Sequence, residues 1–137
     1  MAKLTLEIEE DYDFQLIGIS SHVKDYRICW EINRNLNFDL VREESLKLKT
    51  KEGDQNYAFF VYEDEENLIE YYLISNRSEF GRLIPEEPKS DYFLLTKGHI
   101  TEAESQEICK SISQLKPVLT SYLIEVEALK SKENLIF

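Results

Sequence analysis

Carboxylates gather in one short segment of the chain, between two prolines and ahead of an apolar run. The segment reads RLIPEEPKSDYFLL and spans residues 82–95. Its acids, Glu86, Glu87 and Asp91, are of the type that performs general acid–base catalysis or holds a divalent cation. Acid–base catalysis also needs a pKa that burial or a charged neighbour has shifted, and sequence spacing does not supply that. The segment is therefore a candidate site to which no catalytic residue is assigned.

Other catalytic and metal-binding patterns are missing from the sequence. His22 and His99 lie in no zinc-binding spacing. Cys29 and Cys109 each fall within an apolar helical pattern, where a free cysteine behaves as a small hydrophobe. The four glycines are isolated and form no phosphate-binding loop. We therefore expect no cofactor, no metal site and two reduced structural thiols, although a disulfide between the cysteines stays open.

The same segment also matches a peptide-docking pattern. Arg82, Pro85 and Pro88 fit R-x-x-P-x-x-P, which can form a polyproline helix that docks into aromatic grooves. The neighbouring acids oppose the acidic grooves that bind such peptides, and Leu83 and Ile84 favour burial. Because each proline holds the preceding residue in an extended conformation, a rigid corner of the fold is the better interpretation.

The charge of the chain limits its partners. The 137 residues include 27 acidic and 16 basic side chains, which gives a net charge of −11. Nucleic acids and anionic membranes bind through Lys and Arg, so we expect neither as a direct partner. A basic protein surface, a cation or simple solubility remain open. The start of the sequence has no export signal, and no apolar run reaches the roughly 20 residues of a membrane span, which predicts a cytoplasmic protein.

Hydrophobic periodicity predicts several strands and two helices. Alternation and apolar runs indicate strands at 4–8, 38–48, 56–62, 68–75, 91–96 and 118–126, with a strand or extended segment at 14–19. Helical spacing covers 23–36, with Tyr26 and Trp30 on the predicted apolar face and Ser20 or Ser21 as the N-cap. A second helix begins at the capping box Thr101-Glu-Ala-Glu104 and ends before Pro117.

The order of these elements predicts an α+β fold. The connections in the middle of the chain are too short for parallel crossovers, so the sheet is expected to be antiparallel. We predict a single domain over residues 1–137, in which two helices pack on one face of the sheet. Residues 131–137, SKENLIF, are expected to form a C-terminal tail or an edge segment. Aromatic residues on the other face would stay exposed and offer a docking surface.

Residues 84–92 read IPEEPKSDY, and this stretch resembles the signature of the IPExxxVDY family, small bacterial proteins typical of the Bacteroidetes lineage. The matching residues are Ile84, Pro85, Glu86, Asp91 and Tyr92. Ser90 stands where the family has Val, a departure that matters little if this position is partly exposed. The stretches 11–21, 24–33 and 131–137 also resemble the family, so the resemblance covers almost the whole chain. It implies no established activity.

We therefore expect a non-enzymatic protein with a protein partner, acting as an interaction or accessory module. The signature residues would form a structural lock or contact the partner, with Glu86 or Asp91 accepting backbone N–H groups or pairing with Arg82 or Arg27. The apolar tail residues are a second docking candidate: Leu135, Ile136 and Phe137. A homodimer also stays open.

Two alternatives remain beside this interpretation. One is a carboxylate-based enzyme, or a protein that binds a divalent cation or small ligand through residues 86–92. The other follows only from the resemblance, because family members often lie beside genes for ribonuclease III and pyruvate kinase. It implies a regulator of an RNA-processing or glycolytic enzyme.

Overall fold

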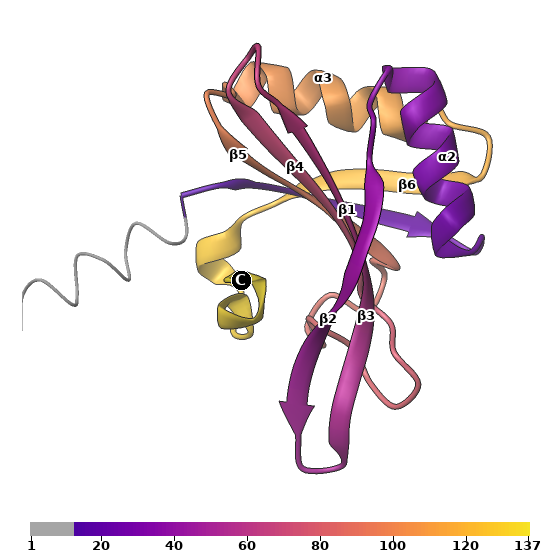
Figure 1. Cartoon of the computed structure of the whole chain (residues 1–137), viewed down its shortest axis with the longest axis vertical. Helices are drawn as coiled ribbons and strands as arrows, with labels where there is room; N and C mark the ends of the chain where they lie inside the picture. Colours follow the sequence, from indigo (N-terminus) through magenta and orange to yellow (C-terminus); the bar gives the residue numbers. More distant parts are fainter. Residues whose placement is uncertain (1–12) are drawn as a thin grey trace, which may run out of the picture.

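The computed structural model describes residues 13–137, which form one six-stranded antiparallel sheet with two helices (Figure 1). The strand order is β2-β3-β4-β5-β1-β6. The strands are β1 (Gln15–Ser21), β2 (Val41–Thr50), β3 (Gly53–Asp64), β4 (Ile69–Ser75), β5 (Tyr92–Gly98) and β6 (Val118–Ile124). The helices are α2 (Asp25–Leu36) and α3 (Glu102–Ser113), followed by the 3₁₀ turns η1 (Val126–Ala128) and η2 (Lys132–Leu135). The predicted α+β class is confirmed, and the strand predicted at 4–8 lies outside the described residues.

Both helices cover the same face of the sheet, as predicted (Figure 1). Ile28 and Ile32 of α2 and Ile112 of α3 are completely buried. They belong to one apolar core with Ile17 of β1 and Leu73 of β4. Burial of this apolar area stabilises the two-layer packing. No helix in residues 13–137 is long and apolar enough to cross a membrane.

The two helices begin in different ways. α3 starts at the predicted capping box: Thr101 Oγ1 accepts the N–H of Glu104 at 3.1 Å, and the Glu104 carboxylate accepts the N–H of Thr101 at 3.0 Å. The predicted N-cap of α2 is wrong, because Ser20 and Ser21 belong to β1. The N-cap residue of α2 is Lys24, whose side chain makes no capping hydrogen bond.

The second face of the sheet is also covered, which corrects the expected exposed aromatic face. Leu83 and Ile84, from the segment before β5, are completely buried there together with Leu135. Leu129 and Phe93 belong to the same second core. Figure 1 shows the C-terminal turns on the side of the sheet opposite to α2 and α3. A loop and the C-terminal segment thus supply the apolar cover that the helices supply on the first face.

Gly18 allows this loop to pack closely on β1. A Cβ atom at Gly18 would lie 2.5 Å from Ser90 Oγ and 2.9 Å from a ring carbon of Tyr122. Real Cβ atoms do not approach other atoms so closely, so glycine is required here for steric reasons.

We predict that Gly18→Ala lowers the free energy of unfolding by roughly 1–3 kcal/mol, because Ser90 and Tyr122 must move from a packed site. Urea denaturation followed by circular dichroism measures this loss. Gly81→Ala is the matched control, since the nearest atom to a Cβ there is the Tyr57 hydroxyl oxygen, 4.0 Å away. A Gly18→Ala protein as stable as the control would contradict the prediction.

Candidate functional site

The signature loop, defined here as residues 82–91, is held in place by one buried amide. Asn76, directly after β4, is completely buried. Its Oδ1 accepts the N–H of Ile84 at 2.7 Å, and its Nδ2 donates to the carbonyl oxygens of Glu87 at 3.0 Å and Ser90 at 2.8 Å. One side chain therefore binds the beginning, middle and end of the loop. Sequence reasoning missed it, because an Asn after a strand is an ordinary turn residue.

Backbone hydrogen bonds of the same residue complete this anchor. The N–H of Asn76 donates to the carbonyl oxygen of Asp91 at 2.9 Å, and the N–H of Leu83 donates to the carbonyl oxygen of Asn76 at 2.9 Å. Arg77 and Arg82 form an isolated antiparallel bridge beside it. These hydrogen bonds pair backbone polar groups of the loop although its apolar residues are buried.

Asp91 connects the loop to β1. The side chain is buried, and its Oδ2 accepts the N–H of Ser21 at 2.8 Å. That N–H lies where the register between β1 and β6 shifts, between Ser20 and Ser21. The guanidinium of Arg77 pairs with the other carboxylate oxygen of Asp91.

The arginine partners that we expected are therefore wrong. Arg82 Nη1 donates to the carbonyl oxygen of Pro88 at 3.0 Å. Arg27 pairs with Glu31, one turn further along α2, at 2.9 Å. The pairing of Asp91 with Arg77 depends on the antiparallel pairing of β4 with β5, in which Ser75 lies opposite Tyr92.

Tyr92 holds the connection between β1 and α2. Its hydroxyl donates to the carbonyl oxygen of Val23 at 2.5 Å. Burial, with smaller effects of Asp25 and Asp91, raises the pKa of Tyr92 to about 12. The hydroxyl consequently remains a hydrogen-bond donor at neutral pH. Asp91 and Tyr92 together fix the backbone that leads into α2.

Glu86 holds the C-terminal segment. Its carboxylate accepts the N–H of Ser131 at 2.5 Å and the hydroxyl of Ser131 at 2.9 Å. Burial acts to raise the pKa of Glu86, but these hydrogen bonds outweigh it and the pKa lies below its ordinary value. Asn134 Nδ2 also donates to the carbonyl oxygen of Leu83 at 2.8 Å. The signature loop and the SKENLIF segment are thus bound to each other.

The apolar tail is partly used by the fold. Leu135 is completely buried, so it is not available for docking. Phe137 packs edge-on against Phe59 and Tyr72, with ring centroids 4.9 Å and 5.2 Å away. Ile136 and Phe137 remain 38% and 43% exposed. Of the three predicted tail residues, Ile136 and Phe137 are thus the two whose side chains a partner could still contact.

Ser90 is completely buried, so the condition of partial exposure is not met. Its hydroxyl lies 2.6 Å from the Tyr122 hydroxyl. Gly18 leaves the space that Ser90 occupies. Ser90 therefore places a hydrogen-bonding group in the core.

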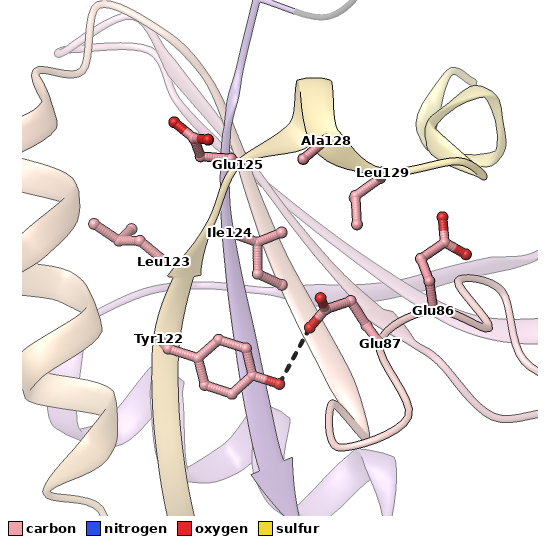
Figure 2. Close-up of a pocket in the computed structure, with 8 residues that line it drawn as sticks. All are labelled: Glu86, Glu87, Tyr122, Leu123, Ile124, Glu125, Ala128 and Leu129. Atoms are coloured by element: carbon pink, nitrogen blue, oxygen red, sulfur yellow. Dashed lines mark hydrogen bonds between the residues drawn. The ribbon is translucent and has the colours of Figure 1, made fainter.

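A cavity of about 320 Å³ lies between the signature loop, β6 and η1 (Figure 2). Its lining includes Glu86, Glu87 and Glu125. Figure 2 shows Glu87 turned toward the Tyr122 hydroxyl, 3.4 Å away, whereas the carboxylate of Glu125 points away from both. Glu86 is bound to Ser131. These carboxylates do not converge on one point, so the geometry does not favour paired acid–base chemistry.

The cysteines and histidines, the remaining candidates for chemistry, form no cluster among residues 13–137. Cys29 and Cys109 are free and buried, as predicted. Burial and the charge of Asp25 raise the pKa of Cys29 to about 11, so its thiol is protonated at neutral pH. His22 and His99 are exposed. Among residues 13–137, no three His, Cys, Asp or Glu side chains are grouped so that they could hold a metal ion.

An aromatic–arginine face, made of Tyr26, Arg27, Trp30 and Arg34, lies on the outside of α2. Tyr26 is 66% exposed and Trp30 is 49% exposed, so the prediction that they face the core is wrong. The guanidinium carbons of Arg27 and Arg34 lie 5.6 Å and 5.1 Å from the Trp30 ring centroid. Periodicity misassigned the aromatic pair, because Tyr26 and Trp30 are themselves one turn apart and mimic a buried stripe.

Comparison with known proteins gives one partial likeness. Over 122 residues the chain is 29% identical to Homeobox protein 12 of Dictyostelium discoideum. This match covers 81% of the chain. The chain spans 14% of the length of that protein. No family model matches the chain, and no solved structure matches it.

We predict that Asn76→Ala destabilises the protein by about 2–4 kcal/mol, because it removes the side-chain partner of the buried N–H of Ile84 and of the buried carbonyl group of Ser90. Urea denaturation gives the loss, and amide hydrogen exchange of residues 83–91 locates it. Asn56→Ala is the control, because Asn56 is exposed on β3. Equal stability and equal exchange in both variants would show that the amide does not hold the loop.

We also predict a pH-dependent loss for Glu86→Gln. The folded-state pKa of Glu86 lies below its ordinary value of 4.5, so its stabilising effect is complete above that pH and is lost as pH falls through the lowered pKa. The stability difference between wild type and variant should therefore be largest near neutral pH and shrink in acid. Ser131→Ala should reproduce part of this difference. A difference that does not change with pH would exclude the carboxylate as its cause.

Proposed function

We propose that the protein is a non-enzymatic interaction module, which binds a protein partner through the aromatic–arginine face of α2. The observation that carries this proposal is the exposure of Trp30 and Tyr26 on a helix whose opposite side is fully packed. Trp, Tyr and Arg are the residues most enriched at the energetic centres of protein interfaces. The partial exposure of Trp30 and its two flanking arginines therefore favour a role in binding a partner over a role in stabilising the core.

The chemistry of this face indicates the kind of partner surface. Arg27 is already paired with Glu31, while the guanidinium of Arg34 lies over Trp30 without an acidic partner among the described residues. A matching surface would offer an apolar pocket to Trp30 and a carboxylate to Arg34. Because the chain as a whole carries a charge of −11, a second copy is a less suitable partner than another protein whose net charge is not strongly negative.

The signature residues support this face instead of forming a site of their own. Asp91 binds the N–H of Ser21 and Tyr92 binds the carbonyl group of Val23, so both fix the chain just before α2. At the other end, Asn33 Nδ2 donates to the carbonyl oxygen of Leu40 at 3.0 Å. The helix is thus held at both ends, and its outer side chains are presented from a rigid position.

The alternative of an enzyme or cation-binding protein at residues 86–92 has less support. Glu86 and Asp91 accept hydrogen bonds from Ser131 and Ser21, and Glu87 faces the Tyr122 hydroxyl. Each carboxylate therefore has a partner within the fold.

We further infer membership of the IPExxxVDY family and a cytoplasmic location. The first is supported by the contact between the signature loop and the 131–137 segment, two stretches that resemble the family. The second is supported by two free buried thiols, since reduced cysteines are typical of the cytoplasm.

Capture experiments with the purified, tagged protein test the proposed face. We expect Trp30→Ala or Arg34→Ala to weaken binding of the captured protein by about tenfold or more, as measured afterwards with both purified partners. Leu119→Ala is the control, because Leu119 is 65% exposed and belongs to β6, so it is not part of the aromatic–arginine face.

Three outcomes would contradict the proposed face. One is equal binding by wild type and Trp30→Ala, and another is an equal loss in the Leu119→Ala control. The third is a wild-type protein that forms only a homodimer by light scattering, with no other partner captured.

A further inference from the structure

A second cavity lies on the helix side of the sheet, beside the first half of α3. Its volume is about 400 Å³, and it opens to solvent between α3, β4 and the connection from α2 to β2. Binding sites for small molecules typically measure roughly 300–1,000 Å³ and are mostly apolar with a few polar groups. The proposed α2 face does not include the residues that line this cavity.

The floor of the cavity is aromatic. Phe38 and Tyr71 line it, and their ring centroids lie 4.3 Å apart. Tyr62 stacks on Tyr71 at 5.5 Å, with an interplanar angle of 10°, and lies 5.4 Å from Phe38. The face of an aromatic ring carries partial negative charge and attracts a cation within about 6 Å of its centroid.

The rim of the cavity is acidic. Glu104 and Glu107 lie about one turn apart on α3 and both line the opening, while none of the described lining residues is basic. Hydrogen bonds from Thr101 keep the pKa of Glu104 below its ordinary value, so Glu104 is ionised at neutral pH. Glu107 is exposed, and its side chain makes no hydrogen bond or ion pair with residues 13–137.

Negative charge at this end of the sheet also contributes to raised pKa values of the Tyr71 and Tyr62 hydroxyls. Burial, followed by the charges of Asp64, Tyr62 and Glu104, raises the pKa of Tyr71 to about 12. Burial and three nearby acids raise the pKa of Tyr62 in the same direction: Asp64, Asp39 and Glu66. The field over the aromatic floor therefore favours a positively charged ligand.

We propose that this cavity binds a small organic cation of the substituted-ammonium class. The alkyl or aryl groups of such a ligand would be desolvated against Phe38, Ile100 and Ile108, and its ammonium would lie between the rings and Glu107. A neutral ligand would not gain from the acidic rim, and an anion would be repelled. A divalent metal ion is a poor match, because it needs several oxygen ligands in place of an apolar floor.

Calorimetric titration with benzyltrimethylammonium chloride, with neutral benzyl alcohol as the comparison, tests this site. We expect the cation to bind at least about tenfold more tightly than the alcohol, and more weakly as salt increases. Amide chemical shifts should change around Tyr71 and along 103–108. Glu107→Gln should weaken binding of the cation about five- to tenfold, and Phe38→Leu about fivefold.

The control for this titration is a charge change outside the cavity. Glu79→Gln makes the same change in net charge at an exposed site outside the lining residues and should leave binding within about twofold. Glu107 lies on the exposed side of a helix, so its variant remains informative even where Phe38→Leu unfolds. The proposal is overturned by no binding to wild type, by equal affinity for alcohol and cation, or by equal losses in the Glu107 and Glu79 variants.

Discussion

The hydrogen bonds of the buried Asn76 amide are the interactions on which the signature loop and the segments bound to it depend. A loop that crosses the face of a sheet brings backbone polar groups into an apolar environment, where each unsatisfied group costs about 1–3 kcal/mol. Asn76 satisfies Ile84, Glu87 and Ser90 with one side chain. Leu83 and Ile84 can therefore be buried without a regular element to carry them.

Because this loop is fixed, its carboxylates can position other parts of the chain. Glu86 holds the C-terminal segment on the second face of the sheet, and Asp91 holds the end of β1, from which α2 begins on the first face. Two of the acids that looked most like catalytic groups, Glu86 and Asp91, thus accept hydrogen bonds from backbone N–H groups. The exposed chemistry lies instead on the helix side, in the aromatic–arginine face and the acid-rimmed cavity.

The local parts of this structure were predictable, and the long-range parts were not. Strand alternation, the capping box at Thr101 and the apolar spacing of α3 are properties of neighbouring residues, and they predict the antiparallel α+β fold. The burial of Ser90 depends instead on the absence of a Cβ at Gly18, 72 positions earlier in the numbering. The outward orientation of Trp30 depends on which side of α2 meets the sheet. Helical spacing alone does not distinguish the exposed pair Tyr26 and Trp30 from the buried pair Ile28 and Ile32.

The position of β1 in the sheet has a consequence for the order of folding. Ile17 pairs with Leu94 on one side and with Leu123 on the other, so both neighbours of this strand come from distant parts of the sequence. β2, β3 and β4 follow one another through short hairpin connections. Closing long loops costs chain entropy before any contact compensates for it, so such topologies fold in roughly milliseconds to seconds. We therefore expect the three-stranded meander to form before β1 pairs with β5, and β6 to join the sheet only through β1, which is its strand partner among the described residues.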